Sequence, residues 1–299
     1  MKSKTHGYLF ALLATTIFSA QDGISKHLAE SYPPIFITMI RYWAFALFAI
    51  ILASRMPGGV RATMRTQRPY LQIVRGVSLA VQVVLAITSF QVAGLARATA
   101  ILNATPLIVA LLAIPLLGEQ VGWRRWTAIV VGLCGMLLIV RPSHGFFEPA
   151  VLVPVVGAVN YAFYIVLTRM AGRVDPPMTS FFYTGIAGAA TISLVGPFFW
   201  STITGWNWAW MAVLCATSTT GHYLLIRAYS ILDASAVQPI SYVSLVYAAL
   251  VGTIVFQETL GWGTIVGSLA IVAAGCFTIW REYARRAPPP VALAEAEHP

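Results

Sequence analysis

Charged residues are scarce in this chain. Only 10% of its 299 residues are Asp, Glu, Lys or Arg, whereas a soluble domain carries about 25%. Apolar residues make up 58% of the chain, and the mean hydropathy is +0.77. This composition excludes a soluble enzyme, a nucleic-acid-binding protein and a disordered scaffold. It indicates an integral membrane protein, because the apolar residues fall into blocks that are each near the length needed to cross a bilayer.

The chain also has few of the residues and motifs that carry chemistry. Its three cysteines, Cys134, Cys215 and Cys276, lie far apart inside apolar runs, which favours small buried side chains over a disulfide or a metal site. It has no G-x-x-x-x-G-K-[ST] phosphate loop, and no loop is long enough to house a catalytic or signalling domain. We therefore expect no cofactor and no metal.

Ten apolar stretches are each about as long as a spanning helix, which needs about 20 residues. An uncharged run of 51 residues, from 176 to 226, holds two of them, separated near Gly196-Pro197. The predicted helices are 7–28, 34–54, 71–92, 97–117, 121–140, 149–169, 177–197, 206–228, 234–256 and 261–280. The predicted fold is an all-α polytopic membrane protein with ten transmembrane helices.

The basic residues indicate how the chain crosses the membrane. If the N-terminus is cytoplasmic, fifteen Lys and Arg residues lie on the cytoplasmic side, and only Lys26, Arg97 and Arg141 lie outside. Basic loops are retained in the cytoplasm, so both termini are expected there. The basic start of the chain and the apolar run after it resemble a signal peptide, but the many spans that follow favour an uncleaved first helix.

Similar motifs end the two halves of the chain. Leu117-Gly118-Glu119-Gln120-Val121-Gly122-Trp123 and Phe256-Gln257-Glu258-Thr259-Leu260-Gly261-Trp262 both contain Glu-x-x-Gly-Trp and continue into a glycine-rich helix. Each follows the fourth predicted helix of its half. Because five helices are an odd number, the second half enters the membrane inverted, as in many secondary transporters. The predicted domains are a first five-helix repeat at 1–145, a second, inverted repeat at 146–281 and a disordered cytoplasmic tail at 282–299.

These motifs resemble those of a known family. The segment Thr105-Pro106-Leu107, the Glu119 motif and Arg141-Pro142 are similar to the EamA repeat of the drug/metabolite transporter (DMT) superfamily. The spacing of Phe18, Asp22 and Lys26 resembles the first helix of many members. The resemblance implies a ten-helix basket in the bacterial inner membrane, a central substrate cavity between the repeats, and alternating access. Within the family the chain is similar to YddG-type amino-acid exporters.

Polar stripes indicate which predicted helices line a path. A helix that faces lipid is apolar on all sides, whereas one that lines a cavity carries polar residues at i, i+3, i+4 and i+7. The first, third, fourth, sixth, eighth and ninth helices carry such stripes, and the second, fifth, seventh and tenth are expected at the periphery. The substrate-binding residues expected from the stripes are Gln82, Asn103, Asn160, Tyr161, Tyr164, His222, Gln238 and Tyr242.

Each of these residues also has a structural interpretation. The four amide side chains serve equally well as interhelical hydrogen-bonding groups. His222 is more often a packing residue than a proton carrier. Asp22 either forms an ion pair, with Lys26 one turn away or with Arg41, or takes part in gating or coupling. The sequence leaves both interpretations open.

The expected function is a secondary transporter that exports neutral amino acids, including aromatic or bulky apolar ones, by alternating access. The alternative is an exporter or facilitator of another small metabolite or a drug. A membrane-embedded enzyme is disfavoured, because the ionisable residues at membrane depth, Asp22, Arg41 and His222, lie on three helices. A sensor or scaffold is disfavoured by the lack of an output domain. The expected partners are a small-molecule substrate and the lipid bilayer, with no nucleic acid, and a monomer is compatible with the sequence.

Overall fold

The computed structural model describes residues 2–117, 123–140, 148–229, 231, 240 and 242–286. These residues form helices and turns, and no strand occurs among them. The first half supplies α1 (Lys2–Ala29), α2 (Pro34–Ser54), α3 (Gly59–Thr63), α4 (Pro69–Ala93), α5 (Leu95–Leu102), α6 (Thr105–Leu117) and α7 (Trp123–Val140). The second supplies α8 (Pro149–Ala171), α9 (Pro177–Val195), the 3₁₀ helix η2 (Gly196–Phe199), α10 (Asn207–Tyr229), α12 (Val243–Ile254) and α13 (Trp262–Arg286). The predicted all-α class is confirmed.

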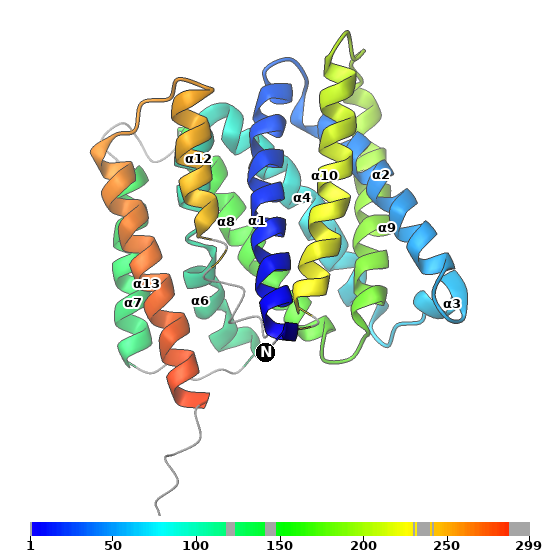
Figure 1. Cartoon of the computed structure of the whole chain (residues 1–299), viewed down its shortest axis with the longest axis horizontal. Coiled ribbons are helices and arrows are strands. Elements are labelled where there is room, and N and C mark those ends of the chain that lie inside the picture. The colour runs from blue at the N-terminus through cyan, green and yellow to red at the C-terminus, as the bar shows by residue number, and fades with distance from the viewer. Residues whose placement is uncertain are drawn as a thin grey trace, which may run out of the picture.

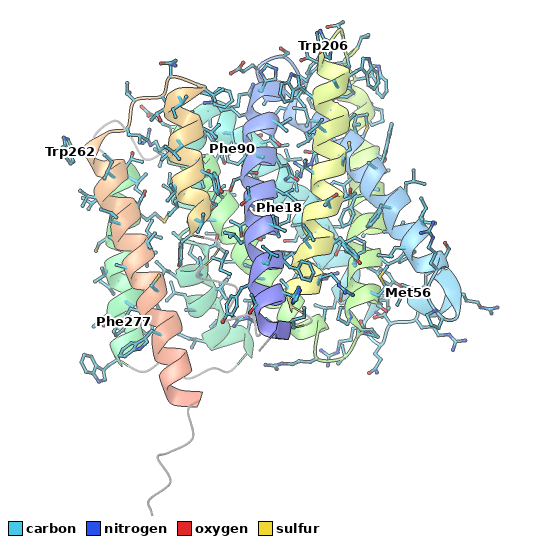
Figure 2. The ribbon with its side chains drawn as sticks, viewed as in Figure 1. Phe18, Met56, Phe90, Trp206, Trp262 and Phe277 are labelled. Carbon is cyan, nitrogen blue, oxygen red and sulfur yellow. The ribbon has the colours of Figure 1, made fainter. Side chains whose placement is uncertain are left out.

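The outer surface of the bundle suits lipid rather than water. Leu47 is 60% exposed, Leu194 76% and Leu269 65%, and exposed apolar side chains at this density are unusual in a soluble protein. Figure 2 shows Trp206 and Trp262 at one end of the bundle, where interfacial tryptophans are expected. Five helical segments, Pro34–Ser54, Pro69–Ala93, Leu95–Leu112, Ala150–Ala171 and Pro177–Phe199, are long and apolar enough to span a membrane. The count of ten spans stays a prediction.

Proline begins four of the long helices, namely Pro34 of α2, Pro69 of α4, Pro149 of α8 and Pro177 of α9. Its ring fixes a helical φ, and the N–H that it lacks would have no partner in the first turn of a helix. The prediction of a helix at 34–54 is confirmed at both ends by α2.

Three predicted features lie outside the described residues. They are Glu119 within 118–122, the start of the helix at 234–256 within 232–239, and most of the tail within 287–299.

The single helix predicted at 97–117 is wrong, because the structure has two helices there. A turn at Asn103 and Ala104 separates α5 from α6. Pro106, the second residue of α6, has no N–H to donate to the preceding turn, and its ring clashes with a continuous helix. The Asn103 amide donates to the Thr99 carbonyl at 2.8 Å, and the Thr105 hydroxyl donates to the Leu102 carbonyl at 2.6 Å. The Thr105 bond satisfies a carbonyl whose helical donor would be the N–H that Pro106 lacks, whereas the Thr99 carbonyl also keeps the Asn103 backbone N–H at 2.9 Å.

The main helix contacts join the two halves of the chain (Figure 1). Helix α1 packs on α10 and α12, α2 on α9 and α10, and α4 on α8 and α9, while α5 packs on α12, α6 on α8, and α7 on α13. The pattern is unchanged when each helix is exchanged with its counterpart in the other half, with α5 and α6 together matching α12. For example, the α1–α10 contact then becomes the α8–α4 contact. The chain therefore packs with internal two-fold symmetry in its contacts.

Small residues allow the closest of these crossings. A Cβ added to Gly135 of α7 would lie 2.8 Å from the Gly267 carbonyl oxygen of α13, closer than real Cβ atoms come. The two backbones therefore touch, as small residues permit in membrane helix pairs. The glycine-rich faces that follow the two Glu-x-x-Gly-Trp motifs thus form a packing seam.

Candidate functional site

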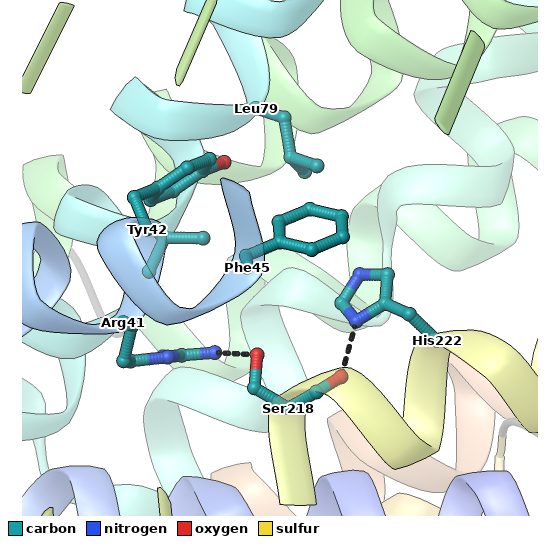
Figure 3. A pocket seen from close by; sticks show the side chains of 7 residues that line it. Arg41, Tyr42, Phe45, Leu79, Ser218 and His222 are labelled. Carbon is teal, nitrogen blue, oxygen red and sulfur yellow. Dashed lines mark hydrogen bonds between the residues drawn. The ribbon is translucent and has the colours of Figure 1, made fainter. Parts of the chain in front are cut away.

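A small cavity lies inside the bundle between α2, α4 and α10 (Figure 3). It offers about 20 Å³ to the centres of water-sized molecules, which is room for about one water. The lining residues are Arg41, Tyr42 and Phe45 of α2, Leu79 and Val83 of α4, and Ser218 and His222 of α10. Because α2 and α4 belong to the first half and α10 to the second, the cavity lies between the halves.

Helical spacing explains why these side chains converge. Arg41 and Phe45, Leu79 and Val83, and Ser218 and His222 are three pairs that are each four residues apart, and residues at i and i+4 lie on one face of a helix. Each helix therefore presents one face to the cavity.

Polar contacts within the cavity centre on Ser218. Arg41 Nη2 donates to the Ser218 hydroxyl at 3.3 Å, and His222 Nδ1 lies 2.8 Å from the Ser218 carbonyl oxygen (Figure 3). Because a carbonyl oxygen only accepts, this contact requires the hydrogen on Nδ1. The imidazole ring is enclosed by aromatic rings, with the centroid of Phe18 at 5.0 Å and that of Phe45 at 5.4 Å. His222 is thereby fixed in orientation.

Arg41 is buried without a full set of partners. Its side chain is 6% exposed, and its Nε has no hydrogen-bond partner in the structure. The hydroxyl of Tyr42, also buried, lacks one as well. Asp22 of α1 interacts electrostatically with Arg41, but no ion pair within 4.0 Å joins them. The cavity therefore holds a buried cation whose donors are only partly used.

The predicted residues Gln82 and Asn160 lie together between α4 and α8. The Asn160 amide nitrogen lies 3.3 Å from the Gln82 side-chain oxygen and 3.0 Å from the Ser78 carbonyl oxygen, and it donates to both. The Ser78 hydroxyl donates to the Asn160 side-chain oxygen at 3.2 Å. The structure thus brings these two amides together as interhelical hydrogen-bonding groups.

Asn103, Tyr161, Tyr164 and Tyr242 are not among the residues that line this cavity. Asn103 reaches the Ser244 hydroxyl of α12 at 3.4 Å. The rings of Tyr161 and Tyr164 stack on α8 with centroids 5.9 Å apart. Tyr242 is 5% exposed and packs in a hydrophobic cluster, with its hydroxyl against Gly275 of α13. Gln238 lies outside the described residues. Of the eight predicted binding residues, the structure places His222 on the cavity wall.

Lys26 pairs with Glu258 and not with Asp22, so the ion pair suggested by local spacing is wrong. Glu258, which lies four residues before the start of α13 in the second Glu-x-x-Gly-Trp motif, also accepts the backbone N–H groups of Leu95 and Ala96 at 2.7 and 3.1 Å. The Lys26 ammonium lies 4.1 Å from the centroid of the Phe256 ring. This cluster joins α1 and α5 to the segment after α12.

The opposite end of the bundle has a second polar cluster that joins the halves. Asp175, between α8 and α9, accepts hydrogen bonds from the Thr66 hydroxyl, the Gln67 N–H and the Gln72 amide, the last at 2.8 Å. Burial raises the pKa of the Asp175 carboxyl, but these hydrogen bonds and the Arg75 charge outweigh it, so the pKa lies below its usual range.

Arg75 was assigned from sequence to the cytoplasmic surface, yet its side chain is only 2% exposed. It donates to the Thr184 hydroxyl at 2.7 Å, to the Ser180 carbonyl and to the Gln72 side-chain oxygen. The sequence holds one indication that Arg75 is buried, because this residue lies more than one turn inside the predicted helix 71–92.

The second predicted helix, expected at the periphery, contributes three of the seven lining residues, so that expectation is wrong. Besides Arg41, it contributes aromatic side chains. A cavity wall made of aromatic rings leaves no polar stripe in the sequence, and a stripe was the feature used to assign lining helices.

The model of the EamA-like transporter family matches residues 5–141 and again residues 149–280. The chain belongs to the EamA-like transporter family. Each match covers one half, so the cavity draws its residues from both EamA regions. The chain is thus a multi-pass membrane protein of a transporter family and not an enzyme.

Individual relatives match this EamA chain over nearly its whole length. It is 27% identical to an S-adenosylmethionine uptake transporter of Rickettsia felis, over 94% of this chain and 95% of the relative. It is 26% identical to a riboflavin transporter of Rhizobium johnstonii (95% and 94%) and 26% identical to the pseudopaline exporter CntI of Pseudomonas aeruginosa (92% and 96%). A crystal structure with 20% identity superposes with a TM-score of 0.62 over 95% of this chain and 99% of its own, which shows a shared fold.

Proposed function

We propose that this chain is a secondary transporter that carries a small organic metabolite across the bacterial inner membrane by alternating access. The observation that carries the proposal is the cavity between the halves, lined by residues from both EamA regions. Transporters built from repeats bind substrate at the interface between the repeats. No group of three or more metal-ligating side chains occurs in the described part of the chain, which suits a site that binds an organic molecule.

The relatives favour a metabolite transporter over an amino-acid exporter in particular. Their names give three different substrates, and both uptake and export occur among them. The alternative drawn from the sequence, another small metabolite, is therefore the better supported substrate class. Export of a neutral amino acid remains a narrower form of the proposal. A buried Arg41 beside aromatic and aliphatic walls suits such a molecule.

The end of the bundle that holds the start of α1 is proposed to be cytoplasmic. In Figure 1, α1 begins and α13 ends at this end, so the first and the last described helix ends share one side. Most basic residues occur in or beside the helix ends found there, among them Arg55, Arg61, Arg65, Arg68, Arg169, Arg173, Arg227, Arg281, Arg285 and Arg286. Only Lys26 and Arg97 are found at the opposite end among the described residues. This asymmetry favours a cytoplasmic location for both termini.

Alternating access requires contacts between the halves to break at one end of the path while they hold at the other. The structure has a polar cluster at each end that joins the halves, with Lys26 and Glu258 at one end and Asp175 with Thr66 and Gln72 at the other. We propose that these clusters close the two ends in turn.

The proposal is tested by solute flux into proteoliposomes that contain the purified protein. The panel comprises S-adenosylmethionine, riboflavin, L-phenylalanine and L-methionine, each quantified by mass spectrometry so that unchanged and converted solute are distinguished. We expect at least one solute to enter unchanged and faster than into protein-free liposomes. Entry no faster than into those liposomes for the whole panel, or recovery of a chemically altered product, would contradict the proposal.

A further inference from the structure

The buried guanidinium of Arg41 is the least satisfied polar group in the cavity. A buried charge is costly unless it is paired and hydrogen-bonded. Among the described residues, Arg41 nevertheless has a single hydrogen bond, to the neutral Ser218 hydroxyl at 3.3 Å, and its Nε has none. A guanidinium has five N–H donors in a planar fork, so most of them remain free for a ligand. An unsatisfied donor in a lined cavity points to a group that binds there.

The cavity is polar on one side and apolar on the other. Figure 3 shows Arg41 beside Ser218, with Phe45 between Tyr42 and His222 and with Leu79 on the far side. A molecule that fits this arrangement has a small charged head for Arg41 and an aromatic or aliphatic part for Phe45 and Leu79.

We propose that Arg41 binds the carboxylate of the transported molecule, whose apolar part contacts Phe45 and Leu79. This inference rests on the proposed function and names its substrate class, a small monocarboxylate with an aromatic or aliphatic part. The planar fork of a guanidinium matches the two oxygens of a carboxylate and holds them by parallel hydrogen bonds. Because the cavity now has room for about one water-sized group, the substrate enters when the helices separate during the transport cycle.

The charges around Arg41 favour a carboxylate over a phosphate. No second Lys or Arg lines the cavity as the structure describes it. The acidic residue that interacts electrostatically with Arg41 is Asp22 of α1. A dianionic phosphate would therefore meet a single cation, whereas one guanidinium matches the charge and the two oxygens of a carboxylate.

A purely structural role for Arg41 is the competing explanation. In that case the guanidinium only balances the charge of Asp22, and no ligand is needed. The two roles predict different results when both charges are removed together. If the role is structural, Asp22→Asn/Arg41→Gln restores both the folding of the protein and its ligand binding. If Arg41 binds substrate, the double variant folds but binds a carboxylate weakly, because it lacks the guanidinium.

The test measures binding to the purified protein in detergent by the ligand-dependent rise in Tm. Phenylacetate is compared with phenylacetamide, a neutral molecule of nearly the same shape, and with phenyl phosphate. We expect phenylacetate to stabilise the protein at lower concentration than either of the others. Binding of phenylacetate should weaken by about 30-fold or more in Arg41→Gln. If that variant does not fold, we expect the same loss in Asp22→Asn/Arg41→Gln. Arg41→Lys keeps the charge without the fork, so its loss should be smaller.

Arg61→Gln is the matched control, because Arg61 is exposed on α3 and distant in sequence from the cavity residues. It should bind phenylacetate as the unmodified protein does. Equal stabilisation by phenylacetate and phenylacetamide, stabilisation by neither, tighter binding of phenyl phosphate, or undiminished phenylacetate binding in the double variant would each overturn the assignment.

Flux experiments separate this inference from the proposed function. If a panel solute enters proteoliposomes and phenylacetate competes with it no better than phenylacetamide does, the carboxylate site is wrong and the transporter stands. If nothing in the panel moves, yet phenylacetate binds through Arg41, the transport proposal fails while the binding site stands.

Discussion

Asp175 shows how a single side chain can hold two halves of a membrane protein together. Its side chain is 6% exposed and accepts hydrogen bonds from Thr66, Gln67 and Gln72, all in the first half of the chain. Thr66 and Gln67 precede α4, and the backbone N–H groups at the start of a helix have no hydrogen-bond partner within that helix. The carboxylate therefore fixes the start of α4 against the turn between α8 and α9.

The folded-state pKa of Asp175 lies below its unfolded value, so this carboxylate should stabilise the fold in a pH-dependent way. The stabilisation is complete above the unfolded pKa of about 3.9 and is lost as the pH falls through the folded pKa. We expect Asp175→Asn to lower the free energy of unfolding at pH 7 by about 1–3 kcal/mol. The difference from the unmodified protein should shrink steadily below about pH 4.

The measurement is the Tm of both proteins in detergent at pH 7, 5, 4 and 3. Glu30→Gln serves as the control, because the Glu30 side chain is 56% exposed and its ion-pair contact with His27 is long, at 4.0 Å. A difference between Asp175→Asn and the unmodified protein that stays constant over this range would contradict the account.

At the residue scale, the sequence could identify unusual side chains but not their partners. Arg41 is conspicuous as a charge inside an apolar run, and the structure places it on the cavity wall. Lys26 was paired with Asp22 because spacing along a helix reveals only neighbours three or four residues away. Its partner, Glu258, is 232 residues further along the chain, and only the packing of α1 against α12 brings the two together.

At the scale of elements, Glu258 ties three segments to one another. Its carboxylate pairs with Lys26 near the end of α1 and accepts two N–H groups at the start of α5, and the residue itself lies in the segment between α12 and α13. Negative charge is favourable at a helix N-terminus, where N–H groups are free and the helix dipole is positive. Gly94 and Gly252 leave the space, since a Cβ at either would lie within 3.0 Å of the carboxylate oxygens.

Glu258→Gln should destabilise the protein, because it leaves the Lys26 ammonium without its counter-charge. The side chains are 12% and 17% exposed, so we expect a loss of about 2–4 kcal/mol, slightly less than for a fully buried pair. The measurement is Tm in detergent. Lys26→Met/Glu258→Gln, which removes both charges, should recover most of the loss. Equal stability of Glu258→Gln and the unmodified protein would show that the pair does not hold the two segments together.

The positions of most helices follow from hydrophobic length and proline, and α2 matches its prediction at both ends. What the pattern missed is the break before α6, where Pro106 interrupts a stretch that is apolar throughout. Hydrophobicity does not report such a break, since both sides are apolar. The polar stripes on α4 and α8 did indicate a contact, which Asn160 and Gln82 make, but a stripe cannot distinguish a helix partner from a substrate.

At the scale of the whole molecule, the main contacts between the halves obey a two-fold exchange, and each half matches the EamA model separately. We propose that the halves are inverted repeats with boundaries near 145 and 281, as five helices per half require. The proposed inversion rests on the predicted five helices per half. The sequence does not show which helices meet in the centre, because that depends on the direction in which each helix faces. The cavity wall formed by Tyr42 and Phe45 is the clearest example.

The proposed topology makes a direct prediction for reporter fusions. Fusions after Arg65 and after Arg286 should both report the cytoplasm, and a fusion near Asn207 should report the outside. Arg65 lies beside α3 and Arg286 ends α13, both at the end of the bundle where α1 begins, whereas Asn207 begins α10 at the other end. Opposite locations for the fusions after 65 and 286 would refute both the ten-span count and the inverted repeat.

Reversible blockage of the cavity is the most direct test of the central claim, that solute passes between the halves through it. Val83→Cys is introduced into a variant in which Cys134, Cys215 and Cys276 are replaced, and flux is measured before and after a bulky, polar, disulfide-forming thiol reagent. Arg61→Cys, at an exposed position on α3 outside the cavity where the reagent can modify it, is the matched control. We predict that modification of Val83→Cys stops flux, that reduction restores it, and that the control keeps its flux throughout. Undiminished flux through fully modified Val83→Cys, or a thiol there that never reacts during turnover, would contradict the account.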